Sequence, residues 1–416
     1  MTDSQNFPDF TDITNNQNPP DNVDTSDGQN SSDSYTDVTE TSWGQRLSGS
    51  IVGVFFGLIL LIGGPWLLWW NEGNEVKALK GLSSAEQSLA LVSSTTIDPS
   101  LNGRLVYLTG DLVAAAPPVD SLFGLTATGQ ARLERHVEMY QWQESSHSET
   151  EKQFGGGQRA VTTYTYDKVW SETPISSNPF HHAQGHINPT MPFRTTVFDA
   201  PNLRIGVYTP DRNLIQKLKD FQPIDPVATI VPDGFRHTSM GFYRGLDEDN
   251  PRIGDLRIAF NGFPLQKVSA VAMQQDAMLF PYSSKTGSRI ELIEAGVVPP
   301  DTLFHDEATK QRIIAWGIRA LCLVMIYLGI SLILAPLTLL GAFLPFFEDI
   351  ADAAVGVAAG AISIVLFCGT IFLSWVVFRP LWAGSIALAG AAVCYGLLRH
   401  RARKRQAKKV IHFLPS

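Results

Sequence analysis

The chain has 416 residues, a formal net charge of −8, 17% charged residues and three cysteines. These averages exclude a basic nucleic-acid-binding chain and a disulfide-rich secreted domain. They also conceal four long uncharged stretches, which determine the fold class that we expect.

The N-terminal segment, residues 1–42, is acidic. It contains eight Asp and one Glu with no Lys or Arg, and it is rich in Asn, Ser, Thr and Pro. Such a segment cannot bury enough apolar surface to offset the entropy lost on ordering. We therefore expect a disordered acidic leader.

Each of the four uncharged runs is long enough to span a bilayer. A helix needs roughly 20 apolar residues to cross a hydrocarbon core about 30 Å thick, and it satisfies its backbone hydrogen bonds internally. The lipid bilayer is thus the first expected partner. The predicted transmembrane helices cover residues 47–70, 313–340, 353–378 and 380–398.

Four spans place both chain ends on one side of the membrane and the intervening residues 71–312 on the other. A dense basic cluster follows the last span within residues 399–416, and such clusters favour the cytoplasm. We therefore expect a cytoplasmic basic tail and an extracytosolic domain.

Glycines recur at four-residue spacing within the spans. Gly49, Gly53 and Gly57 share one helix face, and Gly356 with Gly360 repeats the spacing in the third span. Small residues in this pattern let helix backbones approach closely in lipid. They predict either packing within one four-helix bundle, or self-association and docking to other membrane proteins.

A few charged residues lie at the ends of the spans. We expect Glu72 near the lipid headgroups, Arg319 to extend its side chain toward the interface, and Arg379 to lie in a turn between spans. The sequence places no carboxylate deep in the membrane, which argues against a proton relay or an ion pump.

The middle domain is predicted to be mostly β. Residues 133–144 and 159–172 are rich in aromatic, Val and Thr residues, and they flank the glycine loop 155–157, which is typical of a hairpin. The expected fold class is therefore an α+β membrane protein: one N-terminal span, a mostly β domain and three C-terminal spans.

Signals for catalysis are weak. His181, His182 and His186 are candidate metal ligands, but they lie in a segment of loop composition without a helical metal motif. No catalytic residue and no cofactor is assigned. The scattered Lys and Arg of the domain predict no nucleic-acid partner.

Seven segments of the chain resemble one known family, the transmembrane protein 43 (LUMA) family. HVEMYQWQE and FRPLWAG are the most specific of them. The segments are SWGQRLSGSIVGVFFGL (Ser42–Leu58), NEGNEVKALKGL (Asn71–Leu82), HVEMYQWQE (His136–Glu144), TYDKVW (Thr165–Trp170), GHINP (Gly185–Pro189), WGIRA (Trp316–Ala320) and FRPLWAG (Phe378–Gly384).

The resemblance implies the same arrangement of spans and a role in organising membrane protein complexes. Animal members lie in the endoplasmic reticulum and inner nuclear membrane, with lamins and emerin among their partners. Prokaryotic relatives also exist, and the acidic leader departs from the animal pattern. We therefore expect a prokaryotic member in a bacterial inner membrane, with the domain periplasmic or outside.

The matching segments also supply candidate contact residues. His136, Tyr140 and Trp142 lie on one predicted strand, where they either pack in the core or form a contact surface. Arg379 and Trp382 mark the turn before the last span. The family resemblance supplies no catalytic residues.

Three functions compete at this stage. The leading hypothesis is a non-enzymatic membrane scaffold that binds other membrane proteins. The second is a metal-dependent enzyme at the membrane surface, with the three histidines as ligands. The third is a lipid-binding or lipid-handling protein.

Overall fold

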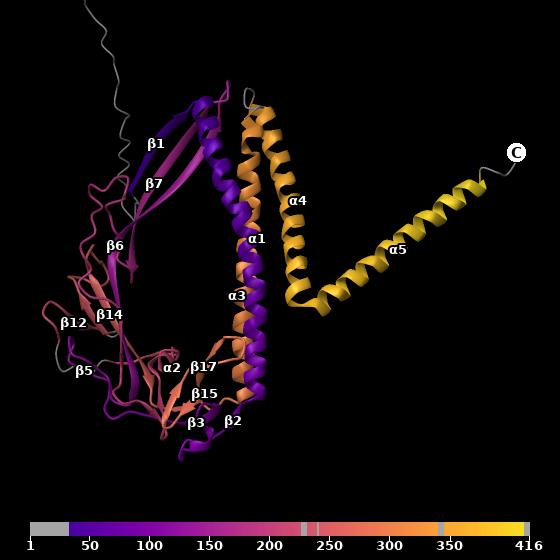
Figure 1. Ribbon diagram of the computed structural model, residues 1–416. Helices are drawn as coiled ribbons and strands as arrows, with labels where there is room; N and C mark the ends of the chain where they lie inside the picture. The colour runs from indigo at the N-terminus through magenta and orange to yellow at the C-terminus, as the bar shows by residue number, and fades with distance from the viewer. Residues whose placement is uncertain (1–32, 226–230, 239–240, 340–344, 412–416) are drawn as a thin grey trace, which may run out of the picture.

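The computed structural model describes residues 33–225, 231–238, 241–339 and 345–411. Four helices are long and apolar enough to cross a membrane, and two larger β-sheets are formed mostly by residues between the first and second of them in the chain (Figure 1). This is the predicted α+β membrane protein. The four helices are α1 (Trp43–Gln87), α3 (Pro300–Leu339), α4 (Pro345–Phe378) and α5 (Pro380–Ile411).

The helices are longer than the uncharged runs that predicted them. α1 has 45 residues and continues well beyond residue 70, while α3 has 40 residues and begins before residue 313. A capping box between Ser42 and Gln45 fixes the start of α1. The uncharged run marks only the part of a helix that can lie in lipid, whereas the polar flanks continue the helix into the domain.

The predicted leader and the predicted basic tail both extend beyond the described residues. α5 continues as a helix to Ile411, so the predicted basic tail 399–416 is helical over most of its length. Residues 412–416 and residues 1–32 of the predicted leader lie outside the described part of the chain.

The larger sheet has eight strands, six of them in the order β1-β7-β6-β14-β13-β12. β8 pairs with β6 and β11 pairs with β14 outside this order. The strands are β1 (Asp33–Thr41), β6 (Gln130–Lys152), β7 (Gln158–Ser171), β8 (Thr196–Asp199), β11 (Gln222–Pro223), β12 (Arg236–Thr238), β13 (Gly241–Arg244) and β14 (Leu256–Pro264).

The second sheet has seven strands, centred on the antiparallel pair β15 and β3. Two short pairs, β4–β5 and β17–β18, and two short helices complete the described domain. These elements are β2 (Ala90–Leu91), η1 (Pro99–Leu101), β3 (Leu105–Val113), β4 (Val119–Asp120), β5 (Leu125–Thr126), β9 (Arg204–Ile205), β10 (Thr209–Pro210), α2 (Arg212–Ile215), β15 (Lys267–Gln275), β16 (Met278–Phe280), β17 (Tyr282–Ser283), β18 (Arg289–Ile290) and β19 (Leu292–Ala295).

The second sheet joins the domain to the helices because side chains alternate between its two faces. On one face Val106 and Leu108 of β3 belong to a core within the domain. On the other face Leu105 packs with Leu82 from the end of α1 and Phe304 from the start of α3. The domain is therefore attached to both helices through a shared apolar core.

The predicted hairpin is confirmed. β6 and β7 pair antiparallel from Met139–Ser171 to Lys152–Gln158, and the glycine loop 155–157 lies at their tip. Figure 1 shows these two strands extending away from the rest of the domain, toward the start of α1.

The edge strand of the larger sheet comes from the acidic leader. β1 precedes α1 in the chain, yet it pairs with β7 from Asp33–Tyr166 to Thr41–Gln158. The prediction of disorder over residues 1–42 therefore does not hold for residues 33–41. Their Tyr, Val and Thr residues favour a β-strand, but the acidic composition of the whole segment conceals that signal.

The hairpin tip lies at the N-terminal end of α1. Arg46 donates a hydrogen bond from Nη1 to the carbonyl oxygen of Gly156 at 2.8 Å. From Arg46 to Glu72 the helix rises about 39 Å at about 1.5 Å per residue, which exceeds the roughly 30 Å of a hydrocarbon core. The hairpin therefore runs beside the apolar part of the helices.

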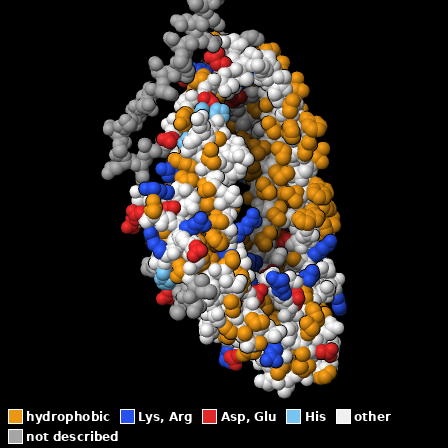
Figure 2. All heavy atoms as spheres, turned by 90° about the vertical axis from the view of Figure 1, so that its left-hand side faces the viewer, with side chains coloured by type: hydrophobic (Ala, Val, Ile, Leu, Met, Phe, Trp, Pro, Cys, Tyr) orange, Lys and Arg blue, Asp and Glu red, His pale blue; other side chains and the backbone are white. Residues whose placement is uncertain are grey.

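This position bears on the predicted division of the chain into two sides. β1 and the hairpin tip share one end of α1, so residues 71–312 do not all lie beyond the opposite end of the helices. Figure 2 shows apolar side chains gathered over the helices and mixed charged side chains over the sheet, with a hollow between them in the upper half.

Candidate functional site

A buried network of charged side chains joins three helices at the end opposite the hairpin tip. Glu72 and Glu75 are one turn apart on α1, so they share a helix face. Arg319 of α3 donates from Nε to Glu72 Oε1 at 2.5 Å and from Nη2 to Glu75 Oε2. Glu72 is fully buried, and Arg319 and Glu75 are only 5% and 7% exposed.

The third helix completes the network. Arg379 follows the end of α4 and donates from Nη2 to Glu75 Oε2 at 2.7 Å. Trp375 of α4 donates its indole N–H to Glu72 Oε2 at 2.9 Å. Two carboxylates thus face two guanidinium groups, so the network has no net charge and both acids are hydrogen-bonded. We call Glu72, Glu75, Arg319 and Arg379 the base network.

The base network corrects one expectation. Arg319 does not extend its side chain freely toward the membrane interface, because its guanidinium group is held between Glu72 and Glu75. The expected depth of Glu72, near the headgroups, stays a prediction, and its side chain is buried between helices. A charged side chain near the end of an apolar run can either extend to water or pair with an opposite charge. Glu72 and Arg319 are 247 residues apart, so the local sequence does not reveal that they pair.

A signal for this network was nevertheless present. Two acids lie one turn apart just after the first apolar run, and single arginines lie beside the second and third runs. The opposite signs at the same end of neighbouring helices point to pairing, since unpaired charges are costly there.

The predicted glycine stripe is packed only in part. A Cβ atom added to Gly57 would lie 2.7 Å from the carbonyl oxygen of Gly329 on α3, so the two backbones cross closely there. Gly53 has room for a Cβ, with Leu332 at 3.5 Å, and Gly49 faces open space. Gly329 was not among the predicted packing residues.

The second glycine pair makes no close helix crossing. The nearest atom to a Cβ added at Gly356 is the hydroxyl of Tyr327 at 3.8 Å, and Gly360 faces open space. The close approach of backbones is therefore between α1 and α3, where Gly57 and Gly329 meet.

The three predicted histidines lie on the outer face of the hairpin, each stacked on a tyrosine. In the loop after β7, His181 stacks on Tyr164 and His182 on Tyr35, each with ring centroids 4.2 Å apart. His186 stacks on Tyr166 at 3.9 Å. The tyrosines come from β1 and β7, where opposite residues point to the same face.

Two polar side chains hold the loop against the sheet. The Asn188 side chain bonds the backbone of Trp142 as a neighbouring strand would. Its Oδ1 accepts from the Trp142 backbone N–H at 2.7 Å, and its Nδ2 donates to the Trp142 carbonyl oxygen at 2.9 Å. Gln141 accepts a hydrogen bond from the backbone N–H of Ile175 at 2.8 Å. The histidines are therefore carried on a loop that is fixed at both ends.

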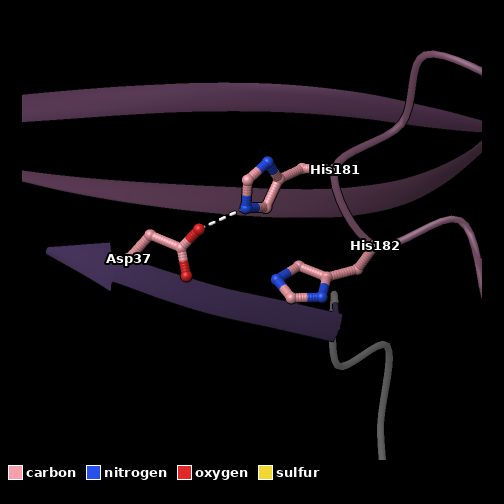
Figure 3. Close-up of side chains that lie close together, drawn as sticks. All are labelled: Asp37, His181 and His182. Carbon is pink, nitrogen blue, oxygen red and sulfur yellow. Dashed lines mark hydrogen bonds and ion pairs between the residues drawn. The ribbon is translucent and has the colours of Figure 1, made fainter. Parts of the chain in front are cut away.

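Only two of the three histidines converge. Nε2 of His181 is hydrogen-bonded to the carboxylate of Asp37 on β1, and the ring edge of His182 is turned toward the same carboxylate (Figure 3). His186 is buried, bonds the backbone carbonyl of His182 through Nδ1 at 2.8 Å, and faces Asp33 through Nε2 at 3.3 Å. The predicted ligand set thus included His186 and missed Asp37.

Burial and a hydrogen bond to Glu144 raise the pKa of Tyr166, beneath this loop, to about 12. Tyr166 therefore stays protonated and donates to Glu144, while its oxygen accepts from the backbone N–H of His182 at 2.8 Å. A neutral tyrosine suits this position, because one hydroxyl group serves two partners.

The residues of the HVEMYQWQE segment lie on the outer face of β6. His136, Tyr140 and Trp142 are partly buried, whereas the alternate residues Val137 and Met139 are in the core. The ring of Trp142 lies beneath the Lys168 ammonium group, 4.7 Å from the ring centroid. Trp142 also contacts His186 edge to face, so this segment supports the histidine loop.

Arg379 and Trp382 were the candidate contact residues at the turn before the last span. Trp382 is 66% exposed at the start of α5, while Arg379 belongs to the base network.

Four apolar helices with an α+β domain between the first and second define an integral membrane protein. The model of the transmembrane protein 43 family matches residues 139–380, and the chain belongs to this family. Human transmembrane protein 43 is 30% identical over 370 residues, covering 84% of this chain and 90% of the human protein. The Drosophila melanogaster homolog is 27% identical over 350 residues, covering 81% and 92%.

The comparison with solved structures gives no match. The family is therefore established from sequence alone, and the base network and histidine loop are described from this chain's own residues.

Proposed function

We propose that this protein is a non-enzymatic membrane scaffold, which holds its α+β domain on a fixed set of helices and presents a further helix to other membrane proteins. The observation that carries the proposal is the exposure of α5. Its apolar side chains include Leu381 at 85% exposed and Leu388 at 75% exposed. Figure 1 shows α5 leaving the end of α4 and projecting away from the other long helices.

The other three long helices support the proposal because, unlike α5, they are tied to one another. α1, α3 and α4 are joined by the base network, and α1 crosses α3 closely at Gly57. The carboxylates of this network are fully engaged with arginine and tryptophan donors, so they are suited to holding helices together rather than to proton transfer. The family resemblance, which implies an organising role in animal members, agrees with this proposal.

Site-specific photocrosslinking in native membranes tests the scaffold proposal. A benzoylphenylalanine placed at Leu388 of α5 is expected to form discrete adducts with other membrane proteins, or with a second copy of the chain. The matched control is Val365 of α4, which is 71% exposed and should contact lipid. Adducts with lipid alone at both positions would remove the basis of the proposal.

We also propose that both chain ends are cytoplasmic, because the basic residues after the last span favour that side. The membrane would be the endoplasmic reticulum or inner nuclear membrane in a eukaryotic cell, or the inner membrane in a bacterium. Reporter fusions after residue 200 and after residue 416 should report opposite sides. Reporters on the same side would contradict this orientation.

The hairpin makes this topology test more specific. A cysteine introduced at Thr150, which is exposed near the hairpin tip, can be labelled from either side of sealed vesicles. Labelling from the side of residue 416 would place the tip beside the start of α1, as in the structure. Labelling from the side of residue 200 would show that the hairpin does not follow the helices in a membrane.

A further inference from the structure

We propose that Asp37, His181 and His182 bind one divalent transition-metal ion, and that the bound ion fastens β1 to the loop after β7. This inference goes beyond the scaffold proposal, since it assigns a ligand to the histidine cluster. It also differs from the hypothesis of a metal-dependent enzyme, because the proposed role of the ion is to hold two segments of the chain together.

The donor atoms are already close together. One ligand atom from each of Asp37, His181 and His182 lies within 4.8 Å of the other two. In a tetrahedral zinc site with bonds of about 2.0–2.1 Å, neighbouring ligand atoms lie about 3.3 Å apart. Small side-chain rotations suffice to reach that spacing. Such a rotation is open to Asp37, whose side chain is 42% exposed.

One donor atom points to a missing partner. Nε2 of His182 is buried and has no hydrogen-bond partner within the described part of the chain. Figure 3 shows this ring edge facing the carboxylate of Asp37, next to the ring edge of His181. A buried polar atom without a partner is costly, and a metal ion between the three groups would satisfy it.

The surroundings fix the rings in a suitable orientation. Stacking on Tyr164 and Tyr35 fixes the ring planes of His181 and His182 and leaves their edges directed at Asp37. The bond from His186 Nδ1 to the carbonyl of His182 holds the loop backbone in place. Two imidazoles and one carboxylate are a ligand set that suits Zn²⁺, with the fourth position left to water.

The expected consequence concerns the segment just before the first membrane helix. Asp37 lies in the middle of β1, an edge strand that pairs with β7 among the described residues. β1 already contacts the histidine loop through Asp33 and Tyr35, and a metal ion at Asp37 would strengthen this attachment. Metal binding would therefore stabilise the pairing of β1 with β7.

Cobalt titration of the full chain in detergent or nanodiscs tests the site. Co²⁺ should bind with about one ion per chain and give the d–d absorption of a four-coordinate site without thiolate charge transfer. Zn²⁺ should displace it. His182→Ala and Asp37→Asn should each abolish the cobalt spectrum.

Two further variants separate a specific site from general histidine binding. His186→Ala removes a residue that positions His182, so affinity should fall by about 10–100-fold. His147→Ala changes a histidine that is 80% exposed elsewhere on β6, so affinity should not change. A cobalt spectrum that survives His182→Ala, or no binding by the wild-type chain, would overturn the proposed site.

Hydrogen exchange tests the proposed attachment and does not depend on the variants folding. In the wild-type chain, adding Zn²⁺ should slow amide exchange in β1. Exchange in β15, which belongs to the second sheet, should not change. Bound Zn²⁺ with no slowing in β1 would show that the ion does not fasten this strand.

Discussion

The two ends of the helix assembly are held by ion pairs of the same chemistry in opposite environments. At the base network the carboxylates and Arg319 are at most 7% exposed. At the hairpin tip Lys152 of β6 reaches Asp349 of α4 at 2.8 Å, but the side chains are 23% and 69% exposed. Removing one partner of a buried pair leaves an uncompensated charge, whereas water replaces a lost partner at the surface.

This difference indicates which end determines the arrangement of the helices. The base network pairs α1 with α3 through buried charges, so a wrong arrangement of these helices leaves a buried charge unpaired. Its link to the end of α4 through Arg379 is 25% exposed. The tip contacts can separate and be hydrated with little change in free energy. We therefore expect mutations at the base to disturb the whole assembly and mutations at the tip to have small, local effects.

The largest effect is expected from Arg319→Met at the base. This change keeps much of the side-chain volume but leaves Glu72 buried without its cationic partner, which should lower the free energy of unfolding by about 3–5 kcal/mol. Steric trapping in bicelles measures this quantity. The control is Arg312→Met, which makes the same change at an exposed position closer to the start of α3. Equal stability of the two variants would mean that the base network does not hold the helices.

A smaller effect is expected where the two helices cross between the ends. Gly57→Val adds a Cβ 2.7 Å from the Gly329 carbonyl oxygen, so the helices must separate. Overpacking of this kind costs about 1–3 kcal/mol, and backbone contact favours the upper end. Gly49→Val, where a Cβ meets open space, is the matched control in the same unfolding assay. If both variants are equally stable, the close crossing contributes nothing.

The sequence predicted the helices well because their defining property is local. Residues 320–347 and 380–398 are long uncharged runs, and length with apolar composition is enough to predict a span. The β6–β7 hairpin was predictable for the same reason, since alternating β-formers flank a glycine loop. In each case the signal lies within one short segment.

The base network and β1 were harder to predict because each depends on a distant segment. Arg319 has the same local sequence whether it extends to water or pairs with Glu72, so only the fold decides between the two. Asp37 lies in a segment whose composition predicts disorder, and its strand forms because β7 offers an open edge. The metal ligand set therefore could not be assembled from the spacing of His181, His182 and His186 alone.

Within the domain, away from both ends, a medium effect is expected from Tyr243→Phe. The buried hydroxyl of Tyr243 donates to Asp255 Oδ2 at 2.7 Å, and losing a hydrogen bond to a charged group costs about 1.5 kcal/mol. Thermal unfolding followed by near-ultraviolet circular dichroism measures the change. An unchanged midpoint would show that this bond does not stabilise the domain.

The same residue gives a pH dependence. Burial, followed by the hydrogen bond to Asp255, raises the pKa of Tyr243 above its ordinary value near 10. The folded state thus retains the proton that the unfolded state loses, so stability is complete below about pH 10 and falls as the pH rises beyond it. The wild-type chain should lose stability more steeply than Tyr243→Phe above pH 10, and parallel profiles would contradict this assignment.

The smallest effect is expected from Lys152→Ala at the tip. An exposed ion pair is worth about 0–1 kcal/mol, so the free energy of unfolding should fall by no more than that. Raising the salt concentration should reduce even this difference. A loss as large as that of Arg319→Met would remove the distinction between the two ends.

A double-mutant cycle at the base tests the central claim most directly, using Arg319→Met, Glu72→Gln and the two changes combined in the steric-trapping assay. In the double variant no charge is left unpaired, because Glu75 keeps Arg379 and the amide at position 72 retains an oxygen for Trp375. We predict that the double variant recovers most of the stability lost in Arg319→Met. Losses that simply add would contradict the account, because Glu72 and Arg319 would then be acting independently.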